Sequence, residues 1–430
     1  MCSFYKNFKN VIFSSNDKLL IFPEITSETS TVLKLSTLRN KTDKNIEKES
    51  ESKSANELNE NEQKIVCGGF SPQNNYFAVI DETKQLYLWK NNLNEFLLLS
   101  IRKVIRKCVV LKFTHSEDVI LVADRSGDVY SFSVNNPDQT GNLILGHLSM
   151  LLDLVISPDD KYIITCDRDE KIRVSCYPNC YNIHSYCLGH TKFVSCLAMF
   201  PSHPELLISG SGDGTFRIWK YKDGLCLCNR NYETDVERNG NQNLKEKTIK
   251  IYNDSESDRA TTNSENDTNM NYAIKQVQCS HRHNIIVALF DRLSCIIIYQ
   301  YNYKPEDCIF SVVQMQMLEY SAEPWKVQFC EQDLLWILLP IKDNVLNILK
   351  SIIHNDQSCK FESIETTNKL TSLINSVNAN WEFFSESLHV QNNFEILYKK
   401  WYDNMEEYQE KKEQKKQAKK KRKSNHNSDK

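Results

Sequence analysis

A nine-residue pattern of polar and apolar positions recurs along the chain. Each copy starts at a tight polar turn and ends in alternating apolar residues. The five clearest copies are Asp81–Trp89, Asp124–Phe132, Asp167–Ser175, Ser211–Trp219 and Asp291–Tyr299. The last residues of the first four copies are 43, 43 and 44 positions apart. Such alternation predicts strands, and a period of this length is typical of WD repeats.

Two polar stretches account for the longer spacings. The fourth and fifth copies lie 80 residues apart, with the Asn-, Asp-, Glu-, Ser- and Thr-rich segment 230–272 between them. An earlier copy, Ser14–Phe22, is separated from the next by the charged segment 37–63. Removing either segment restores about one period, so both are predicted to be loop insertions. With the weaker copy Ile341–Leu349, the copies number seven.

An apolar segment precedes each polar turn, so each copy is predicted to complete a hairpin. Two copies also follow a Gly-His pair. One copy carries the full set that ties the strands and loop of a WD blade together by hydrogen bonds: His190, Ser209, Asp213 and Trp219. In the preceding copy, His147 and Asp169 stand at matching positions and are predicted to be structural partners.

These features predict an all-β fold, a seven-bladed WD-repeat β-propeller over residues 1–392. No single blade can bury both faces of its sheet, so the ring has to close. We expect the strands up to Phe22 to pair with strands contributed from after Leu349. The segment 350–392 is too irregular for its strands to be assigned.

Residues 393–430 are predicted to form a C-terminal amphipathic helix and a basic tail. Apolar residues recur at helical spacing over about 393–418, at Phe394, Leu397, Tyr398, Trp401, Met405 and Tyr408. This spacing places them on one stripe of a helix. We expect the stripe to dock on the propeller and the basic end to project into solvent.

The net charge of −3 is divided unevenly. Residues 411–423 carry a charge of +8, which leaves −11 for residues 1–410. The tail residues of interest are Lys415, Lys416, Lys419, Lys420, Lys421, Arg422 and Lys423. Such a run is typical of nuclear import or of contact with nucleic-acid phosphates, and a merely solvating tail is the alternative. Two surfaces of opposite charge suggest two kinds of partner.

The composition argues against several classes of protein. The 15 cysteines contain no C-x-x-C pair, so no metal site is expected. No apolar run approaches the ~18 residues of a membrane span, and the N-terminus lacks the apolar core of a signal peptide. We therefore expect reduced thiols in the cytoplasm or nucleus.

Candidate catalytic motifs are weak. The string Gly210-Ser-Gly-Asp-Gly214 imitates a phosphate-binding loop, but it leads into Phe216–Trp219, which reads as a strand rather than a helix. His147 and His190 have the context of structural imidazoles. No Ser/His/Asp or Cys/His set can be assembled, so the chain is not expected to be an enzyme.

One turn is unusually charged. Six of the seven residues of Asp167–Arg173 carry charge. By strand alternation Ile172 and Val174 should face inward, while Lys171 and Arg173 should face outward. A solvated turn is the simpler interpretation, and contact with a partner is the alternative.

Several longer strings carry a family resemblance. In order within 122–191 they are VADRSGDVYSFS, LGHLSMLLD, SPDD, DRDEKIRVS and LGHT. Together they closely resemble the non-catalytic WD-repeat subunit of tRNA (guanine-N7-)-methyltransferase. The close match covers about 122–220. A weaker match includes the first blade, the helix and the basic tail, whereas the two inserts do not match.

The resemblance implies a function without catalysis by this chain. The family binds and stabilises a separate catalytic subunit that uses S-adenosylmethionine, so no cofactor is expected here. The heterodimer forms 7-methylguanosine in the tRNA variable loop, at position 46 of the tRNA. The expected location is the nucleus, with the cytoplasm as a second location.

The resemblance also implies site residues. In this family the arginine that ends the DRDEKIR string, here Arg173, contributes to the catalytic-subunit interface. Lys171 and Arg168 lie on the same turn, and Arg125 lies on the equivalent turn of the adjacent blade. Replacing Arg173 is then expected to leave the propeller folded. The basic tail is expected to face tRNA phosphates or to serve import.

A different kind of WD-repeat scaffold is the competing hypothesis. A ubiquitin ligase receptor or a ribosome-assembly factor would have the same fold. A ligase receptor often shows W-D-x-R after the blade's Trp, and the residues Trp219–Lys222 read WKYK instead. An independent enzyme is the third hypothesis, and it lacks a catalytic constellation.

Overall fold

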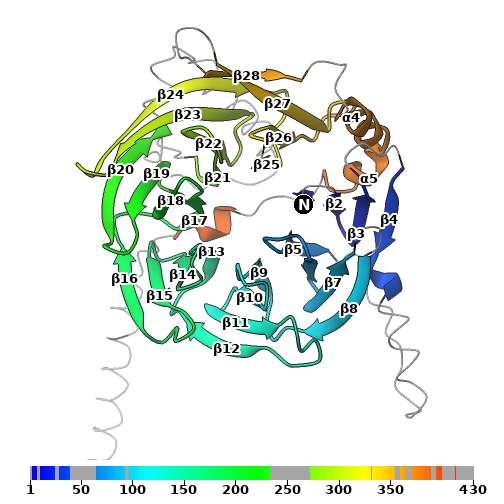
Figure 1. Ribbon diagram of the computed structural model, residues 1–430, viewed down its shortest axis with the longest axis horizontal. Coiled ribbons are helices and arrows are strands. Elements are labelled where there is room, and N and C mark those ends of the chain that lie inside the picture. The colour runs from blue at the N-terminus through cyan, green and yellow to red at the C-terminus, as the bar shows by residue number, and fades with distance from the viewer. Residues whose placement is uncertain are drawn as a thin grey trace, which may run out of the picture. The chain divides into compact units, whose positions relative to one another are not determined.

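The computed structural model describes residues 2–6, 10–24, 29–38, 64–92, 96–232, 272–330, 332–353, 359–364, 370–388, 394–399 and 412. The chain divides into two compact units, Met1–Phe394 and Glu395–Lys430. The first unit is a ring of seven sheets, each with four antiparallel strands (Figure 1). The predicted seven-bladed propeller is therefore confirmed.

Each blade is built from four strands that are consecutive along the chain, so we call them strands a to d. Blades 1 to 3 comprise β1 (Ser3–Lys6), β2 (Val11–Ser15), β3 (Lys18–Phe22), β4 (Thr31–Lys34); β5 (Ile65–Phe70), β6 (Tyr76–Asp81), β7 (Gln85–Asn91), β8 (Phe96–Lys103); β9 (Cys108–Phe113), β10 (Val119–Asp124), β11 (Asp128–Ser133), β12 (Asn142–Gly146). Blades 4 and 5 comprise β13 (Leu151–Ile156), β14 (Tyr162–Asp167), β15 (Ile172–Cys176), β16 (Ile183–Cys187); β17 (Val194–Phe200), β18 (His203–Ser211), β19 (Thr215–Lys220), β20 (Leu225–Asn231). Blades 6 and 7 comprise β21 (Ile274–Cys279), β22 (Ile285–Phe290), β23 (Cys295–Lys304), β24 (Ile309–Glu319); β25 (Lys326–Phe329), β26 (Leu335–Leu338), β27 (Leu346–Ile353), β28 (Cys359–Ser363).

The nine-residue repeat is the b–c turn followed by strand c. In blade 5, for example, Ser211 ends β18 and Thr215–Lys220 form β19, and the other six copies fall at the same place in their blades. Strands a line the centre of the ring and strands d lie at its rim (Figure 1). Because successive strands are antiparallel, the b–c turns and d–a connections lie on one face of the ring, and the a–b turns lie on the other.

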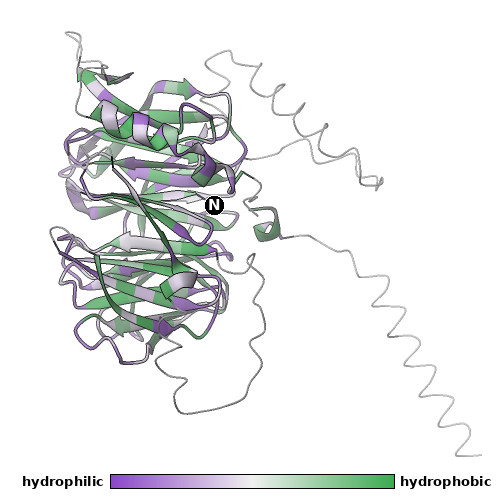
Figure 2. Cartoon of the chain, turned by 90° about the vertical axis from the view of Figure 1, so that its right-hand side faces the viewer, coloured by the Kyte–Doolittle hydropathy of each residue, from purple (hydrophilic) through white to green (hydrophobic). Residues whose placement is uncertain are grey.

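The core lies between blades. Among the described residues, seven clusters of buried apolar side chains occur, and each joins two consecutive blades. Between blades 5 and 6, for instance, Phe216 packs on Tyr299 with ring centroids 5.0 Å apart. In Figure 2 the strands are mostly green, whereas purple is frequent in the connecting turns. Each blade therefore depends on its neighbours to cover both faces of its sheet.

Carboxylates in the a–b turns also join neighbouring blades. The backbone amides of His115 and Ser116 donate to Asp160 of the next blade, at 2.8 and 2.9 Å. His281 and Arg282 donate in the same way to Asp333, both at 2.9 Å. Asp160 and Asp333 have φ angles of 50° and 57°, in the left-handed region that short polar residues tolerate. These links fix the spacing of the blades on the a–b face.

The predicted mode of ring closure was wrong. Blade 1 takes all four strands from Ser3–Lys34, and blade 7 takes its four from Lys326–Ser363. Among the described residues no strand is shared between the first and last blades, which meet there through side chains and through the hydrogen bond from Lys326 to the Phe4 carbonyl. Phe4 of β1 stacks on Trp336 of β26, with ring centroids 6.2 Å apart.

Two helices that the sequence pattern did not reveal complete this junction. They are α4 (Leu370–Ala379) and α5 (Trp381–Ser385), inside the segment 350–392. Leu373, Val377 and Phe384 enter the same buried cluster as blades 1 and 7. Beyond α5, Ser387 Oγ lies 2.8 Å from Ser15 Oγ, and Glu386 pairs with Lys18 at 2.6 Å. The helices thus replace the missing shared sheet.

The predicted inserts and tail lie mostly outside the described residues. Of 37–63, only 37 and 38 are described, in a helical turn. Of 230–272, the first two residues still belong to β20, and Tyr232 and Tyr272 meet with ring centroids 5.8 Å apart. Of the predicted helix over 393–418, the structure describes a 3₁₀ helix at Phe394–Leu397 and the helical residue Lys412. Outside the described residues lie Trp401, Met405 and Tyr408 of the predicted stripe and the tail residues Lys415, Lys416, Lys419, Lys420, Lys421, Arg422 and Lys423.

We predict that Phe384→Ala destabilises the whole propeller. The Phe384 ring is fully buried and lies 5.5 Å from the Phe13 ring, centroid to centroid, so the variant leaves a cavity at the ring junction. Loss of a buried Phe costs about 3–5 kcal/mol of unfolding free energy. Urea unfolding measures this loss, and Leu388→Ala, at an exposed site of the same segment, is the control. A loss below about 1 kcal/mol for Phe384→Ala would show that the helices do not support closure.

Candidate protein-interaction surface

A continuous hydrogen-bond chain crosses blade 5. His190 Nδ1 lies 2.9 Å from Asp213 Oδ2, and His190 Nε2 lies 2.8 Å from Ser209 Oγ. Trp219 Nε1 donates to the same Ser209 oxygen at 2.8 Å. This hydrogen-bond network links strands b and c of the blade to the d–a connection and to the b–c turn. The four residues singled out in the sequence are therefore brought together.

One arrangement of protons gives each donor and acceptor in this hydrogen-bond network a partner. Trp219 donates to Ser209, Ser209 donates to His190 Nε2, and His190 Nδ1 donates to Asp213. Burial lowers the pKa of His190 below its ordinary value. Burial alone would raise the pKa of Asp213, but hydrogen bonds from His190 and Thr215 outweigh it and hold that pKa well below the usual range. A neutral imidazole and an ionised carboxylate thus form a structural pair.

Blade 4 has a similar chain with a different carboxylate. His147 Nδ1 lies 3.2 Å from Asp167 Oδ2, and His147 Nε2 lies 2.7 Å from Thr165 Oγ1. The predicted pairing with Asp169 was wrong. Asp167 ends strand b, and it accepts the amides of Asp169 and Lys171 at 2.9 and 3.0 Å while also facing His147. In blade 5 Ser211 stands at that strand end, so the carboxylate comes from the turn itself.

Arg173 does not face solvent, contrary to the prediction from strand alternation. Its side chain is only 8% exposed. Nη1 donates to the carbonyl of Gly146 at 2.9 Å, and Nε donates to Ser175 Oγ at 3.2 Å. Alternation places the side chain on the second face of blade 4, but in a propeller the adjacent blade covers that face. Gly146 ends β12 of blade 3, so Arg173 joins two blades beneath the d–a connection.

The other basic residues of the predicted site lie nearer the surface. Lys171 and Arg125 are exposed, and Arg168 is half-buried. All three lie on the b–c turns of blades 3 and 4. Arg106 belongs to the same face and donates to Ser126 Oγ at 2.7 Å, beside Arg125. The structure therefore brings Arg125, Arg168 and Lys171 to one face and places Arg173 beneath it.

Three aliphatic side chains on this face were missed by the sequence analysis. Each lies in a d–a connection: Ile105 is 59% exposed, Leu188 is 62% exposed, and Leu148 is fully exposed. The connections join blades 2 to 3, 3 to 4 and 4 to 5. Their signal in the sequence was an apolar residue outside any strand, next to a Gly-His pair for Leu148 and Leu188. The three aliphatic side chains and the basic residues of the b–c turns therefore lie on the same face of the ring.

The cysteines and the glycine-rich turn that the sequence analysis weighed can also be located in the structure. The described part of the chain holds no cluster of three His, Cys, Asp or Glu placed to bind a metal ion. The cysteines described there are free thiols. No helix in those ranges is long and apolar enough to cross a membrane. A Cβ on Gly212 would lie 2.4 Å from the Phe193 ring, so the glycine-rich turn accommodates a protein side chain.

We predict that the propeller loses stability as the pH falls from 7 toward 5. Burial lowers the pKa of both His147 and His190 in the folded state. Below about 6.5 the unfolded chain therefore binds protons that the folded chain does not, which favours unfolding. Urea midpoints across this range measure the effect.

Two variants test whether the buried imidazoles cause this loss of stability at low pH. His190→Gln should destabilise the propeller by about 1–3 kcal/mol at pH 7 and should flatten the pH dependence. His184→Gln, at an exposed site, should change neither. An unchanged pH dependence in His190→Gln would contradict the assignment.

The chain is similar in sequence to a family model of a WD40 domain and to several known proteins. Residues 133–344 match the family model described as the tRNA methyltransferase TRM82 WD40 domain. The mouse tRNA (guanine-N(7)-)-methyltransferase non-catalytic subunit WDR4 is 35% identical over 347 residues, which is 80% of this chain and 75% of that protein. The human protein of the same name is 34% identical with the same coverage.

Two further similarities have lower sequence identity. The Drosophila mojavensis non-catalytic subunit wuho is 29% identical over 82% of this chain and 83% of its own length. The crystal structure of RRP9 WD40 repeats superposes with a TM-score of 0.54 at 14% identity, over 76% of this chain and 83% of that one. The last similarity shows the fold alone. The mouse and human proteins, at 35% and 34% identity over 80% of this chain, show that it belongs to the family of tRNA (guanine-N(7)-)-methyltransferase non-catalytic subunits.

Proposed function

We propose that this chain binds a separate catalytic subunit and holds it in the state that methylates N7 of a guanosine in the tRNA variable loop, at position 46 of the tRNA. Membership of the non-catalytic family carries the proposal. A protein that binds only the competent state of its partner shifts the population toward that state. S-adenosylmethionine then belongs to the partner, and this chain contributes binding energy.

The b–c face of blades 2 to 4 is the surface we propose for the catalytic subunit. It offers exposed aliphatic side chains at Ile105, Leu148 and Leu188 between basic residues. Aliphatic groups at the centre of an interface supply affinity, whereas charges around them set orientation and association rate. The complementary surface on the partner is apolar with carboxylates around it, and these would pair with Arg125, Arg168 and Lys171.

Arg173 acts in this proposal as a positioning residue. Its guanidinium holds the Gly146 carbonyl, two residues before Leu148. Loss of this bond would free the loop that presents Leu148 and would remove a hydrogen bond between blades 3 and 4. A hydrogen bond made by a charged donor contributes about 1.5–3 kcal/mol to stability. An Arg173 substitution would therefore affect assembly through the fold as well as through contact. This differs from the expectation that its replacement leaves the propeller intact.

The basic tail has a separate role in the proposal. Its charge of +8 over 411–423 suits tRNA phosphates, and the same run suits nuclear import. Both roles fit a nuclear protein that also occurs in the cytoplasm.

We predict that charge reversal on the b–c face abolishes assembly without unfolding the chain. In cells that lack this protein, wild type should restore 7-methylguanosine in purified tRNA, and the double variant Arg125→Glu, Lys171→Glu should restore far less. Both side chains are exposed, so the unfolding midpoint should stay unchanged.

Lys161→Glu is the matched control for this experiment. Lys161 is 73% exposed and lies in the a–b turn of blade 4, on the opposite face. It should rescue fully. Equal rescue by the double variant would place the catalytic subunit elsewhere, and no rescue by wild type would contradict the proposed function.

We predict that removal of residues 411–430 weakens binding of tRNA to the assembled complex and lowers its salt dependence. Each phosphate contact that is lost reduces the slope of log affinity against log salt by about 0.7–0.9. Titrations at several salt concentrations, with full-length and shortened chains, measure the slope. An unchanged slope would restrict the tail to import.

A further inference from the structure

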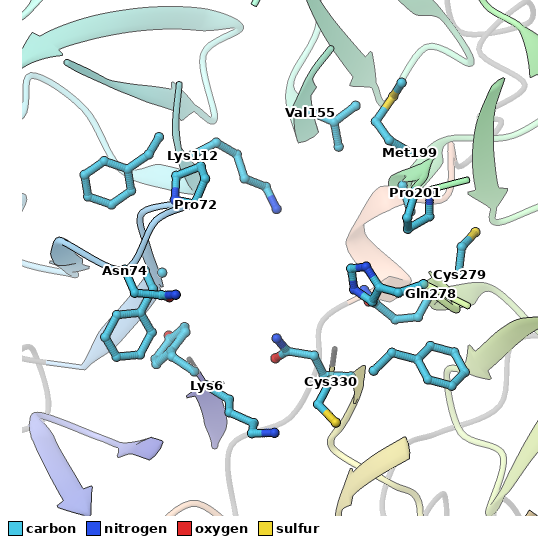
Figure 3. Close-up of a pocket in the computed structure, with 18 of the residues that line it drawn as sticks. Lys6, Pro72, Asn74, Lys112, Val155, Met199, Pro201, Gln278, Cys279 and Cys330 are labelled. Carbon is cyan, nitrogen blue, oxygen red and sulfur yellow. The ribbon is translucent and has the colours of Figure 1, made fainter. Parts of the chain in front are cut away.

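The centre of the propeller forms an open channel of about 1240 Å³. Strands a and the a–b turns line it, including residues of β1, β5, β9, β13, β17, β21 and β25. It opens on the a–b face, opposite the surface proposed for the catalytic subunit. Figure 3 shows Lys6 and Lys112 directed into this space from different sides, with Asn74 also pointing toward it. The proposed function makes no use of this channel.

The described residues of the channel wall carry positive charge. Lys6, Lys112 and Lys326 come from three different inner strands, and Arg282 comes from the a–b turn of blade 6. Among the residues that line the channel in the described ranges, none is Asp or Glu. Clustered cations repel one another, and a channel with low-dielectric walls focuses their field. Such an arrangement is stabilised by an anion.

Lys326 is the most constrained of these cations. Its Nζ donates to the Phe4 carbonyl at 3.0 Å and to Ser3 Oγ at 3.4 Å, and it lies 4.7 Å from the centroid of the Tyr5 ring. No carboxylate contacts it within the described residues. Burial and the charge of Lys112 lower the pKa of Lys326 to about 7. A nearby anion would restore its charge.

Lys112 is exposed and lines the channel, and the Asp153 carboxylate lies within its electrostatic range. Asp153 feels the charge of Lys112, but its two oxygens accept the amides of Leu154 and Leu197, both at 2.8 Å. Asp153 also lies outside the channel lining. Its hydrogen bonds therefore hold it within the wall, and Lys112 remains available to a ligand.

We propose that this channel binds a compact polyanion, a small molecule that carries several phosphate groups. The cations come from blades 1, 3, 6 and 7, so a ligand that meets several of them has to present charge in several directions. A single phosphate meets too few of them, and an extended strand presents its charge along one line. The volume of about 1240 Å³ accommodates a molecule of drug-like size.

Calorimetric titration of the full chain with two probes tests the proposal. Inorganic tripolyphosphate carries its charge in a line, and inositol hexakisphosphate carries it around a ring. At 150 mM salt and pH 6.5 we expect the second probe to bind in a 1:1 ratio and more tightly than the first. Lys112→Gln should weaken that binding by about tenfold or more, since it removes a charge-assisted contact. Lys326→Gln should do the same.

The control is Lys161→Gln, which removes an exposed lysine outside the channel lining and should leave binding unchanged. Lys112 is exposed, so its variant should keep the wild-type unfolding midpoint, which separates lost binding from lost folding. Failure of both probes to bind wild type would overturn the proposal. Equal weakening by Lys161→Gln, or binding of a ten-nucleotide single-stranded RNA that depends on Lys112 when neither small probe binds, would also overturn it.

Discussion

Every blade of this protein has two apolar faces, and neither can be left in water. Buried side chains project from both faces of the central strands, as in β22, where all six residues are buried. A layer of helices or a second sheet packed on one face of a blade would leave its other face in water. A closed ring covers both sides of every blade at once, so the seven inter-blade clusters are parts of one cooperative core.

Closure is the most demanding part of this arrangement. A ring whose first and last blades share strands is held by backbone hydrogen bonds, but the described strands of these two blades form separate sheets. The chain compensates with α4 and α5, whose apolar residues fill the junction, and with polar links from Ser387 and Glu386 back to blade 1. The buried Phe4 and Trp336 rings complete it. The N-terminal strand and a helix near residue 384 thereby become mutually dependent.

The antiparallel order of strands also separates two functions in space. The b–c turns and d–a connections of blades 2 to 4 carry the basic and aliphatic groups that we propose for the catalytic subunit, and Arg173 donates to the Gly146 carbonyl beneath them. The a–b turns and inner strands present cations to the channel. Carboxylates that could neutralise the channel are engaged elsewhere: Asp160 and Asp333 bind backbone amides of neighbouring blades, and Asp153 binds amides within the wall. The same carboxylates thus link the blades and leave the cations of the channel without them as partners.

The sequence by itself determined the repeat, the number of blades, the position of strands b and c, and the His190 chain, because these depend on local alternation and on fixed spacings within one blade. It also located the charged turn and the family. Only the tertiary structure decided which side chains of strand c are exposed to solvent. Alternation assigns them to two faces of the strand, but it cannot show that a neighbouring blade covers the second face. Arg173 is buried for this reason. The tertiary structure decided the choice of Asp167 over Asp169, since the carboxylate that reaches His147 depends on how the turn folds back. It decided closure through α4 and α5 and the convergence of Lys112 and Lys326, because residues over 200 positions apart meet only when the ring is complete.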